Sequence, residues 1–161
     1  NLLFSPGNST PVWAENRVFV ATPDRYLNAI DAATGATVFR SKECLYRESI
    51  GLSADGKMIY AKTMKGELSA IPADSPDGKA AWIVPLGWSD EHNPCPELEV
   101  RGMIYAGSRQ GEIAAVEATP PHAVQRFRCG RSEGNGLAAL PDGSVLATLI
   151  EGTIFRLTGR Q

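Results

Sequence analysis

The stretch AIDAATGATVFR, residues 29–40, sets the pattern on which the fold depends. An alternating apolar run leads into Asp31, Thr34 and Gly35, and the aromatic Phe39 follows four positions after the glycine. Asp and Thr side chains bond to nearby backbone groups in turns, and glycine accepts a positive φ angle. We therefore interpret the stretch as a tight turn between two buried strands, with Phe39 on the second strand.

The same pattern recurs along the chain without gaps. Residues 20–32, 61–73, 106–118 and 147–159 align, and their starts lie 41, 45 and 41 residues apart. Four apolar columns result, and their members are Val18, Ile59, Ile104 and Val145; Phe19, Tyr60, Tyr105 and Leu146; Leu27, Leu68, Ile113 and Ile154; and Ile30, Ile71, Val116 and Leu157. A period of about 40–45 residues with several short strands in each copy is typical of a β-propeller. One blade cannot bury both of its faces, so the blades are expected to stack.

The fold is predicted to be all-β, because short alternating runs end in Gly, Pro, Asn or Asp throughout. We expect one domain over residues 1–161: a β-propeller segment of about four antiparallel blades of four strands, near residues 9–43, 49–87, 96–130 and 136–161. The last blade is incomplete, with room for three strands. Residues 1–6, which include Leu2, Leu3 and Phe4, are expected to form a strand of a preceding blade or of the last one, and the exposed edge permits edge-to-edge self-association.

Composition excludes several classes of protein. The chain has 161 residues, 43% of them apolar, and a formal net charge of −2. This content suits a globular domain, and the absence of a basic excess argues against a nucleic-acid partner. No apolar run reaches membrane-spanning length, so no transmembrane segment is predicted.

Residues 20–39 resemble the repeat of quinoprotein (PQQ-like) β-propellers, which reads V-G-S-x-D-G-x-L-x-A-L-D-x-x-T-G-x-x-x-W. The matching positions are Val20, Ala21, Thr22, Asp24, Leu27, Ala29, Asp31, Thr34, Gly35 and Phe39. A second copy matches through Gly107, Ser108, Gly111, Ile113 and Ala115. The resemblance implies a propeller of the kind found in quinone-dependent dehydrogenases, in outer-membrane assembly lipoproteins and beside calcineurin-like metallophosphoesterases. It also favours an extracytoplasmic (periplasmic or secreted) location.

The sequence assigns no cofactor and no catalytic residue to this chain. Dehydrogenases that this repeat resembles hold their quinone with calcium and often carry two adjacent cysteines. Here Cys44, Cys95 and Cys129 are far apart, and no Asp/Glu/Asn cluster of the kind that calcium needs stands out. We therefore explain the aspartate and the aromatic residue of the repeat by turn geometry and blade packing.

One face of the predicted propeller carries the candidate site. Loops between the second and third strands share a face with the loops between blades, and together they bring the candidate partner-binding residues Arg25, Lys65, Asp90, Glu91, His92 and Arg109. The mixed signs fit a protein or another polar ligand better than nucleic acid. The segment GWSDEHNPCPE, residues 87–97, contains types of side chain that bind metals but has no second cluster for zinc, so we interpret it as a partner contact or an ordinary solvated loop.

Two functional hypotheses follow. We favour a non-catalytic binding or scaffolding module that forms the C-terminal part of a longer protein. The alternative is the propeller domain of an enzyme, a calcineurin-like metallophosphoesterase or a quinoprotein dehydrogenase, with its catalytic part outside this chain. Sequence upstream of residue 1 would separate the two, through metal-binding Asp/His/Asn motifs or paired cysteines.

Overall fold

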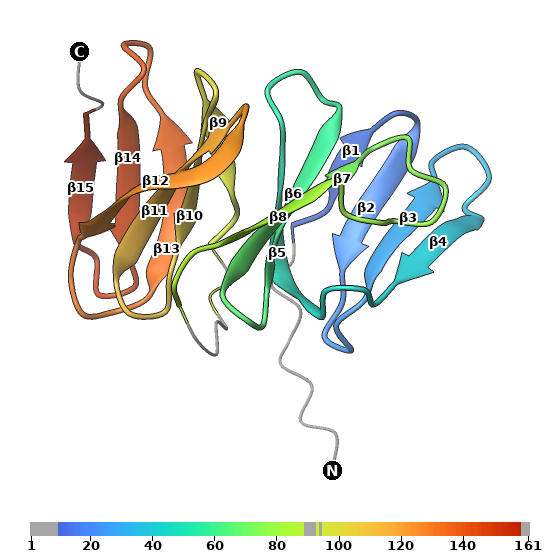
Figure 1. Cartoon of the computed structure of the whole chain (residues 1–161), viewed down its shortest axis with the longest axis horizontal. Helices are drawn as coiled ribbons and strands as arrows, with labels where there is room; N and C mark the ends of the chain where they lie inside the picture. Colours follow the sequence, from blue (N-terminus) through green and yellow to red (C-terminus); the bar gives the residue numbers. More distant parts are fainter. Residues whose placement is uncertain (1–9, 89–92, 94, 159–161) are drawn as a thin grey trace.

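The computed structural model describes residues 10–88, 93 and 95–158 (Figure 1). These residues form fifteen strands and no helix, and so no helix that is long and apolar enough to cross a membrane. The predicted strand at residues 1–6 lies outside this part of the chain.

The strands form four antiparallel sheets, here numbered one to four in chain order. Sheet one contains β1 (Val12–Ala14), β2 (Arg17–Ala21), β3 (Leu27–Asp31) and β4 (Thr37–Ser41). Sheet two contains β5 (Tyr46–Leu52), β6 (Met58–Thr63), β7 (Glu67–Pro72) and β8 (Trp82–Pro85). Sheet three contains β9 (Leu98–Val100), β10 (Met103–Gly107), β11 (Glu112–Ala118) and β12 (Pro121–Arg128). Among the described residues, sheet four contains β13 (Gly134–Ala139), β14 (Val145–Leu149) and β15 (Ile154–Leu157), which agrees with the prediction of an incomplete last blade.

The four sheets stand side by side in chain order and form an open arc (Figure 1). Within each sheet the strands follow one another in sequence order, so the first strand of every sheet lies at one edge. These first strands, β1, β5, β9 and β13, contact one another in succession and form the inner side of the arc. The arrangement confirms the predicted β-propeller segment.

Each copy of the repeat pairs in the same register. Val18 lies opposite Ile30, and the equivalent pairs in the other sheets are Ile59–Ile71, Ile104–Val116 and Val145–Leu157. Side chains alternate between the two faces of a strand, so one register places each apolar column on one face in every sheet.

Three apolar cores lie between successive sheets. Ile59 and Ile71 pack against sheet one, whereas Tyr60 and Leu68 of the same strands pack against sheet three. The third core joins sheets three and four. Four members of the apolar columns identified from the repeat are 0–1% exposed: Ile59, Leu68, Ile104 and Ile113.

The turn at Asp31–Gly35 has the predicted structure. Asp31 Oδ1 accepts hydrogen bonds from the backbone N–H of Ala33 (3.1 Å) and of Thr34 (2.7 Å), and Gly35 has a φ of 73°. Phe39 is 6% exposed and packs on sheet two, where a Cβ atom on Gly78 would lie 2.5 Å from its ring. The turn therefore delivers the aromatic side chain to the next sheet, as the repeat predicts.

Truncation of Leu68 tests the stacking of the sheets. Leu68→Ala should lower the free energy of unfolding by about 2–5 kcal/mol, because it leaves a cavity between sheets two and three. Urea denaturation measures this change. Ile83→Ala, at a 44% exposed position of the adjacent β8, is the matched control and should change stability by no more than about 0.5 kcal/mol. A Leu68→Ala protein as stable as the parent would contradict the assigned core.

Candidate partner-binding face

The connections between strands lie on two opposite sides of the arc, at the two ends of the strands. The turns β2–β3, β6–β7 and β10–β11 lie at the same end of the sheets as the connections β4–β5, β8–β9 and β12–β13, along the lower edge of Figure 1. This follows from the alternating strand directions, because every second connection of an antiparallel meander returns to the same side. We call this side the loop face.

Three of the predicted site residues lie on described turns of the loop face. Arg25 has a φ of 73°, and its backbone N–H donates to the carbonyl of Thr22 (2.8 Å), so the side chain projects from a tight turn and is exposed. Lys65 is also exposed, in the β6–β7 turn. Arg109 differs, because its Nε atom lies 3.6 Å from Glu133 Oε1 in an ion pair. Asp90, Glu91 and His92 lie outside the described residues.

The β8–β9 connection, which carries the undescribed Asp90, Glu91 and His92, is held firmly at its start. Trp88 donates from Nε1 to Glu112 Oε2 on β11 (3.0 Å). The backbone of Trp88 also approaches the β6–β7 turn closely, since a Cβ atom on Gly66 would lie 2.3 Å from its carbonyl oxygen. This end of the connection is thereby fixed between sheets two and three.

Asn93 fixes the other end of the connection. Its side chain is buried, and Nδ2 donates to the carbonyl of Gly134 on β13 (2.6 Å), while Oδ1 accepts from the backbone N–H of Cys95 (3.0 Å). The hydroxyl of Ser49 on β5 donates to the Asn93 carbonyl (3.3 Å). The bonds of one residue thus reach sheets two and four and the chain that leads into sheet three.

A buried lysine completes this anchor. Lys62 is 1% exposed, and its Nζ donates to Asn93 Oδ1 (3.0 Å), the Cys95 carbonyl (3.1 Å) and the Gly107 carbonyl (2.7 Å). An ammonium has three donors, so these acceptors satisfy it fully. The anchor was not predicted from the sequence. One signal existed, because Lys62 occupies a position of the repeat that holds Ala21 in sheet one and Gly107 in sheet three.

Glu97 lies beside this lysine, in an environment that disfavours the charged form of its carboxyl group. Its Oε1 is 4.0 Å from Lys62 Nζ, and neither carboxyl oxygen has a hydrogen-bond partner among the described residues. Complete burial raises the pKa of Glu97 to about 7, and the attraction of Lys62 opposes this rise. The backbone here is equally tight, since a Cβ atom on Gly51 of β5 would lie 2.3 Å from the Glu97 carbonyl oxygen.

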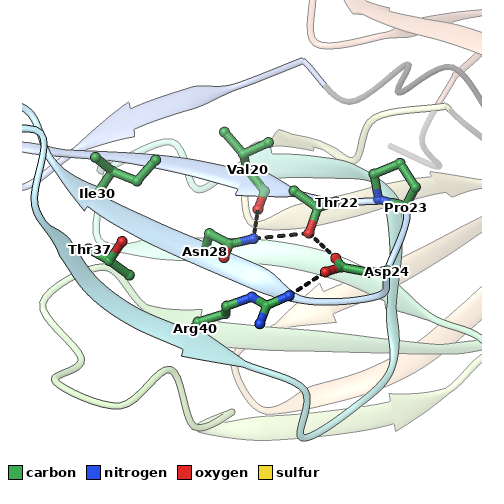
Figure 2. A pocket seen from close by; sticks show the side chains of 8 residues that line it. All are labelled: Val20, Thr22, Pro23, Asp24, Asn28, Ile30, Thr37 and Arg40. Carbon is green, nitrogen blue, oxygen red and sulfur yellow. Dashed lines mark hydrogen bonds and ion pairs between the residues drawn. The ribbon is translucent and has the colours of Figure 1, made fainter. Parts of the chain in front are cut away.

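A hollow of about 460 Å³ lies on the open face of sheet one, beside the β2–β3 turn of the loop face (Figure 2). Its lining comprises Val20, Thr22, Pro23, Asp24, Asn28, Ile30, Thr37 and Arg40. Figure 2 shows Asp24 between the Thr22 hydroxyl and the Arg40 guanidinium, and these two hydrogen bonds lower the pKa of Asp24. The polar groups therefore satisfy one another. No group of three or more His, Cys, Asp or Glu side chains suited to a metal occurs in the described part of the chain.

The stacked sheets and their inner strands define the class of this protein, a β-propeller segment of PQQ-like repeats. The sequence family described as outer membrane protein assembly factor BamB matches residues 2–159, and the chain belongs to this family. A search of curated proteins found no match.

Solved structures share the fold at low sequence identity. BamB from Moraxella catarrhalis aligns over 96% of this chain and 46% of its own, with a TM-score of 0.72 and 18% identity. A chain of the mitotic checkpoint complex aligns over 99% and 50%, with a TM-score of 0.77 and 19% identity. The computationally designed Ika4 protein aligns over 97% and 94%, with a TM-score of 0.69 and 14% identity. The present chain thus spans about half the length of the first two.

The pKa of Glu97 predicts how stability depends on pH. The folded protein keeps a proton on Glu97 up to about pH 7, whereas the unfolded chain releases it near the ordinary value of 4.5. The contribution of Glu97 to the free energy of unfolding is therefore complete below pH 4.5. It falls by about 3 kcal/mol as the pH rises through 7. Urea denaturation between these pH values measures it.

Glu97→Gln is the control for this pH dependence. The amide does not titrate, so the variant should lose the Glu97 part of the slope, while all other titrating groups remain the same. Parallel stability curves for the two proteins between pH 4.5 and 7 would show that Glu97 does not hold this proton.

Proposed function

We propose that this chain is a non-catalytic binding module that recruits a protein partner through its loop face. The anchored β8–β9 connection carries the proposal. Trp88 and Asn93 hold its two ends, and the charged sequence Asp90-Glu91-His92 stands between them. Binding residues are found disproportionately on loops that a rigid scaffold positions. Here the scaffold includes the buried Lys62, whose hydrogen bonds help to fix the connection.

The charges of the loop face favour a protein over nucleic acid. Arg25 and Lys65 are exposed cations, and Arg109 is paired with Glu133. A surface of both signs selects a complementary surface, whereas nucleic acid requires a continuous basic stripe. The family description, an assembly factor, and the likeness to a chain from a multiprotein complex both support a protein partner.

Charge reversal on the loop face tests this function. Arg25→Glu combined with Lys65→Glu should reduce the partner recovered from extracts of the native host by roughly fivefold or more, because the encounter and the rim contacts depend on complementary charge. Recovery by the parent should also fall as salt rises from about 50 to 300 mM. Quantitative mass spectrometry of cross-linked pulldowns measures both effects.

Lys57→Glu, on the opposite side in the β5–β6 turn, is the matched control and should retain the partner. Arg17 on that side is unsuitable, because its guanidinium donates to the carbonyls of Ala73 (3.1 Å) and Ser75 (2.6 Å) and joins sheets one and two. Loss of the partner with Lys57→Glu alone would place the surface on the other side. Equal recovery by every variant would leave the loop face as solvated turns.

A further inference from the structure

Three connections of the loop face meet beside sheets one and two: the β2–β3 turn, the β4–β5 connection and the β6–β7 turn. Lys42 of the β4–β5 connection places its Nζ atom 5.1 Å from the centre of the Tyr26 ring in the β2–β3 turn. The backbone N–H of Met64 in the β6–β7 turn donates to the carbonyl of Leu45 in the same connection (3.2 Å). The three connections therefore form one continuous surface.

Each of these connections presents one exposed cation. The three are Arg25, Lys42 and Lys65, and we call them the cation cluster. None of them has a carboxylate partner among the described residues. A cation is attracted to the face of an aromatic ring, so Tyr26 helps to hold the Lys42 ammonium at this surface.

The carboxylates on the same three connections are already bonded within the chain. Asp24 pairs with Arg40. Glu43 Oε2 accepts from the backbone N–H of Ala80 in the β7–β8 connection (3.1 Å), and Glu67 Oε2 accepts from a hydroxyl at the end of β6 (3.0 Å). The charged groups that remain without a bonded partner on this surface are therefore all cations.

The cations of the loop face at sheet three are arranged differently. Arg109 pairs with Glu133 (3.6 Å), and Arg128 pairs with Glu112 (3.2 Å). Arg131 is exposed on the connection between sheets three and four, without an ion-pair partner among the described residues. Unpartnered cations are thus grouped only beside sheets one and two.

The opposite side of the arc does not share this pattern. In the described part of that side, Lys57 is an exposed cation without an ion-pair partner, and Glu15 and Asp74 are exposed carboxylates without one. Both signs of charge are available to a ligand there, whereas the cation cluster offers only one.

We propose that the cation cluster binds an acidic segment of the partner protein, in which several Asp or Glu carboxylates accept hydrogen bonds from Arg25, Lys42 and Lys65. This inference rests on the proposed function and names the chemistry of the partner at that site. Hydrogen bonds between a cation and a carboxylate are shorter and stronger than those between neutral groups. Because the three cations stand on three different connections, a run of carboxylates matches them better than a single one.

The number and grouping of the cations favour an acidic protein segment over nucleic acid. Proteins that depend on the phosphate backbone typically contact about six to ten phosphates along a basic stripe. Here the neighbouring cations at sheet three are neutralised by Glu133 and Glu112, so no such stripe continues across the described loop face. Three grouped cations suit a short segment of complementary charge.

A titration followed by two-dimensional ¹H–¹⁵N NMR tests the proposal with the purified chain. The probe is a synthetic peptide of about twelve residues that alternates Glu and Ser, and its control replaces every Glu with Gln. The acidic peptide should shift the amide signals of residues 22–26, 42–45 and 64–66 saturably, and the control peptide should not. Its affinity should fall by roughly fivefold or more between about 50 and 300 mM salt.

Charge-reversal variants locate the binding. Lys42→Glu should weaken the acidic peptide by roughly fivefold or more, and reversal of all three cations should abolish saturable binding. Arg131→Glu on the loop face and Lys57→Glu on the opposite side are matched controls and should bind within about twofold of the parent. All these positions are exposed, and circular dichroism checks that each variant keeps the fold.

The outcomes separate this inference from the proposed function. A parent that recovers its partner in the pulldown but does not bind the acidic peptide would overturn only the acidic segment. Peptide binding that survives reversal of the whole cluster, or tighter binding of single-stranded DNA or of anionic lipid vesicles, would also overturn it. A parent that binds the peptide through the cluster but recovers no partner would support the preference of the cluster for carboxylates and contradict the proposed function.

Discussion

Packing of one sheet on the next is the interaction on which this structure depends. A small twisted sheet with apolar residues on both faces has no core of its own, and neighbouring sheets must supply it. In sheet two, Ile59 and Ile71 serve one neighbour, and Tyr60 and Leu68 serve the other. The short strands, the tight turns at Gly35 and Gly78 and the close inner strands all follow from this demand for contact on both sides.

The same packing also holds the connections of the loop face in place. Inner strands that approach closely enough to require Gly51 leave little room for water around the chain that leads into sheet three. Buried ammonium and carboxyl groups are expensive there unless hydrogen bonds compensate. Lys62 is fully compensated, and its acceptors are the groups that fix the β8–β9 connection. Glu97 is not, which is why burial dominates its pKa.

The repeat made most of the fold predictable, because its signals are local. Alternation over five or six residues determines which face Ile59 and Leu68 occupy, and the Asp31–Gly35 turn is encoded within five positions. The anchor at Lys62 was not predicted, because its bonds join residues 31, 33 and 45 positions apart, and the repeat relates only Lys62 and Gly107 without indicating that they are in contact. The hydrogen bonds of Arg17 were not predicted for the same reason, since its acceptors lie 56 and 58 positions away in another sheet. Topology alone placed Arg25 and Lys65 on the loop face. Which neighbouring side chains pair with an opposite charge there depends on side-chain positions, and the sequence does not specify those positions.

The three hydrogen bonds of Lys62 also determine which sheets of the arc are expected to separate first. Sheets two and three are joined by a fully buried cation with three acceptors, whereas the cation that joins sheets one and two, Arg17, is only half-buried, and the core between sheets three and four contains no charged residue among the described residues. Local unfolding begins where the fewest interactions are lost at once. The arc is therefore expected to fray from its terminal sheets inward, with the central pair as the last cooperative unit.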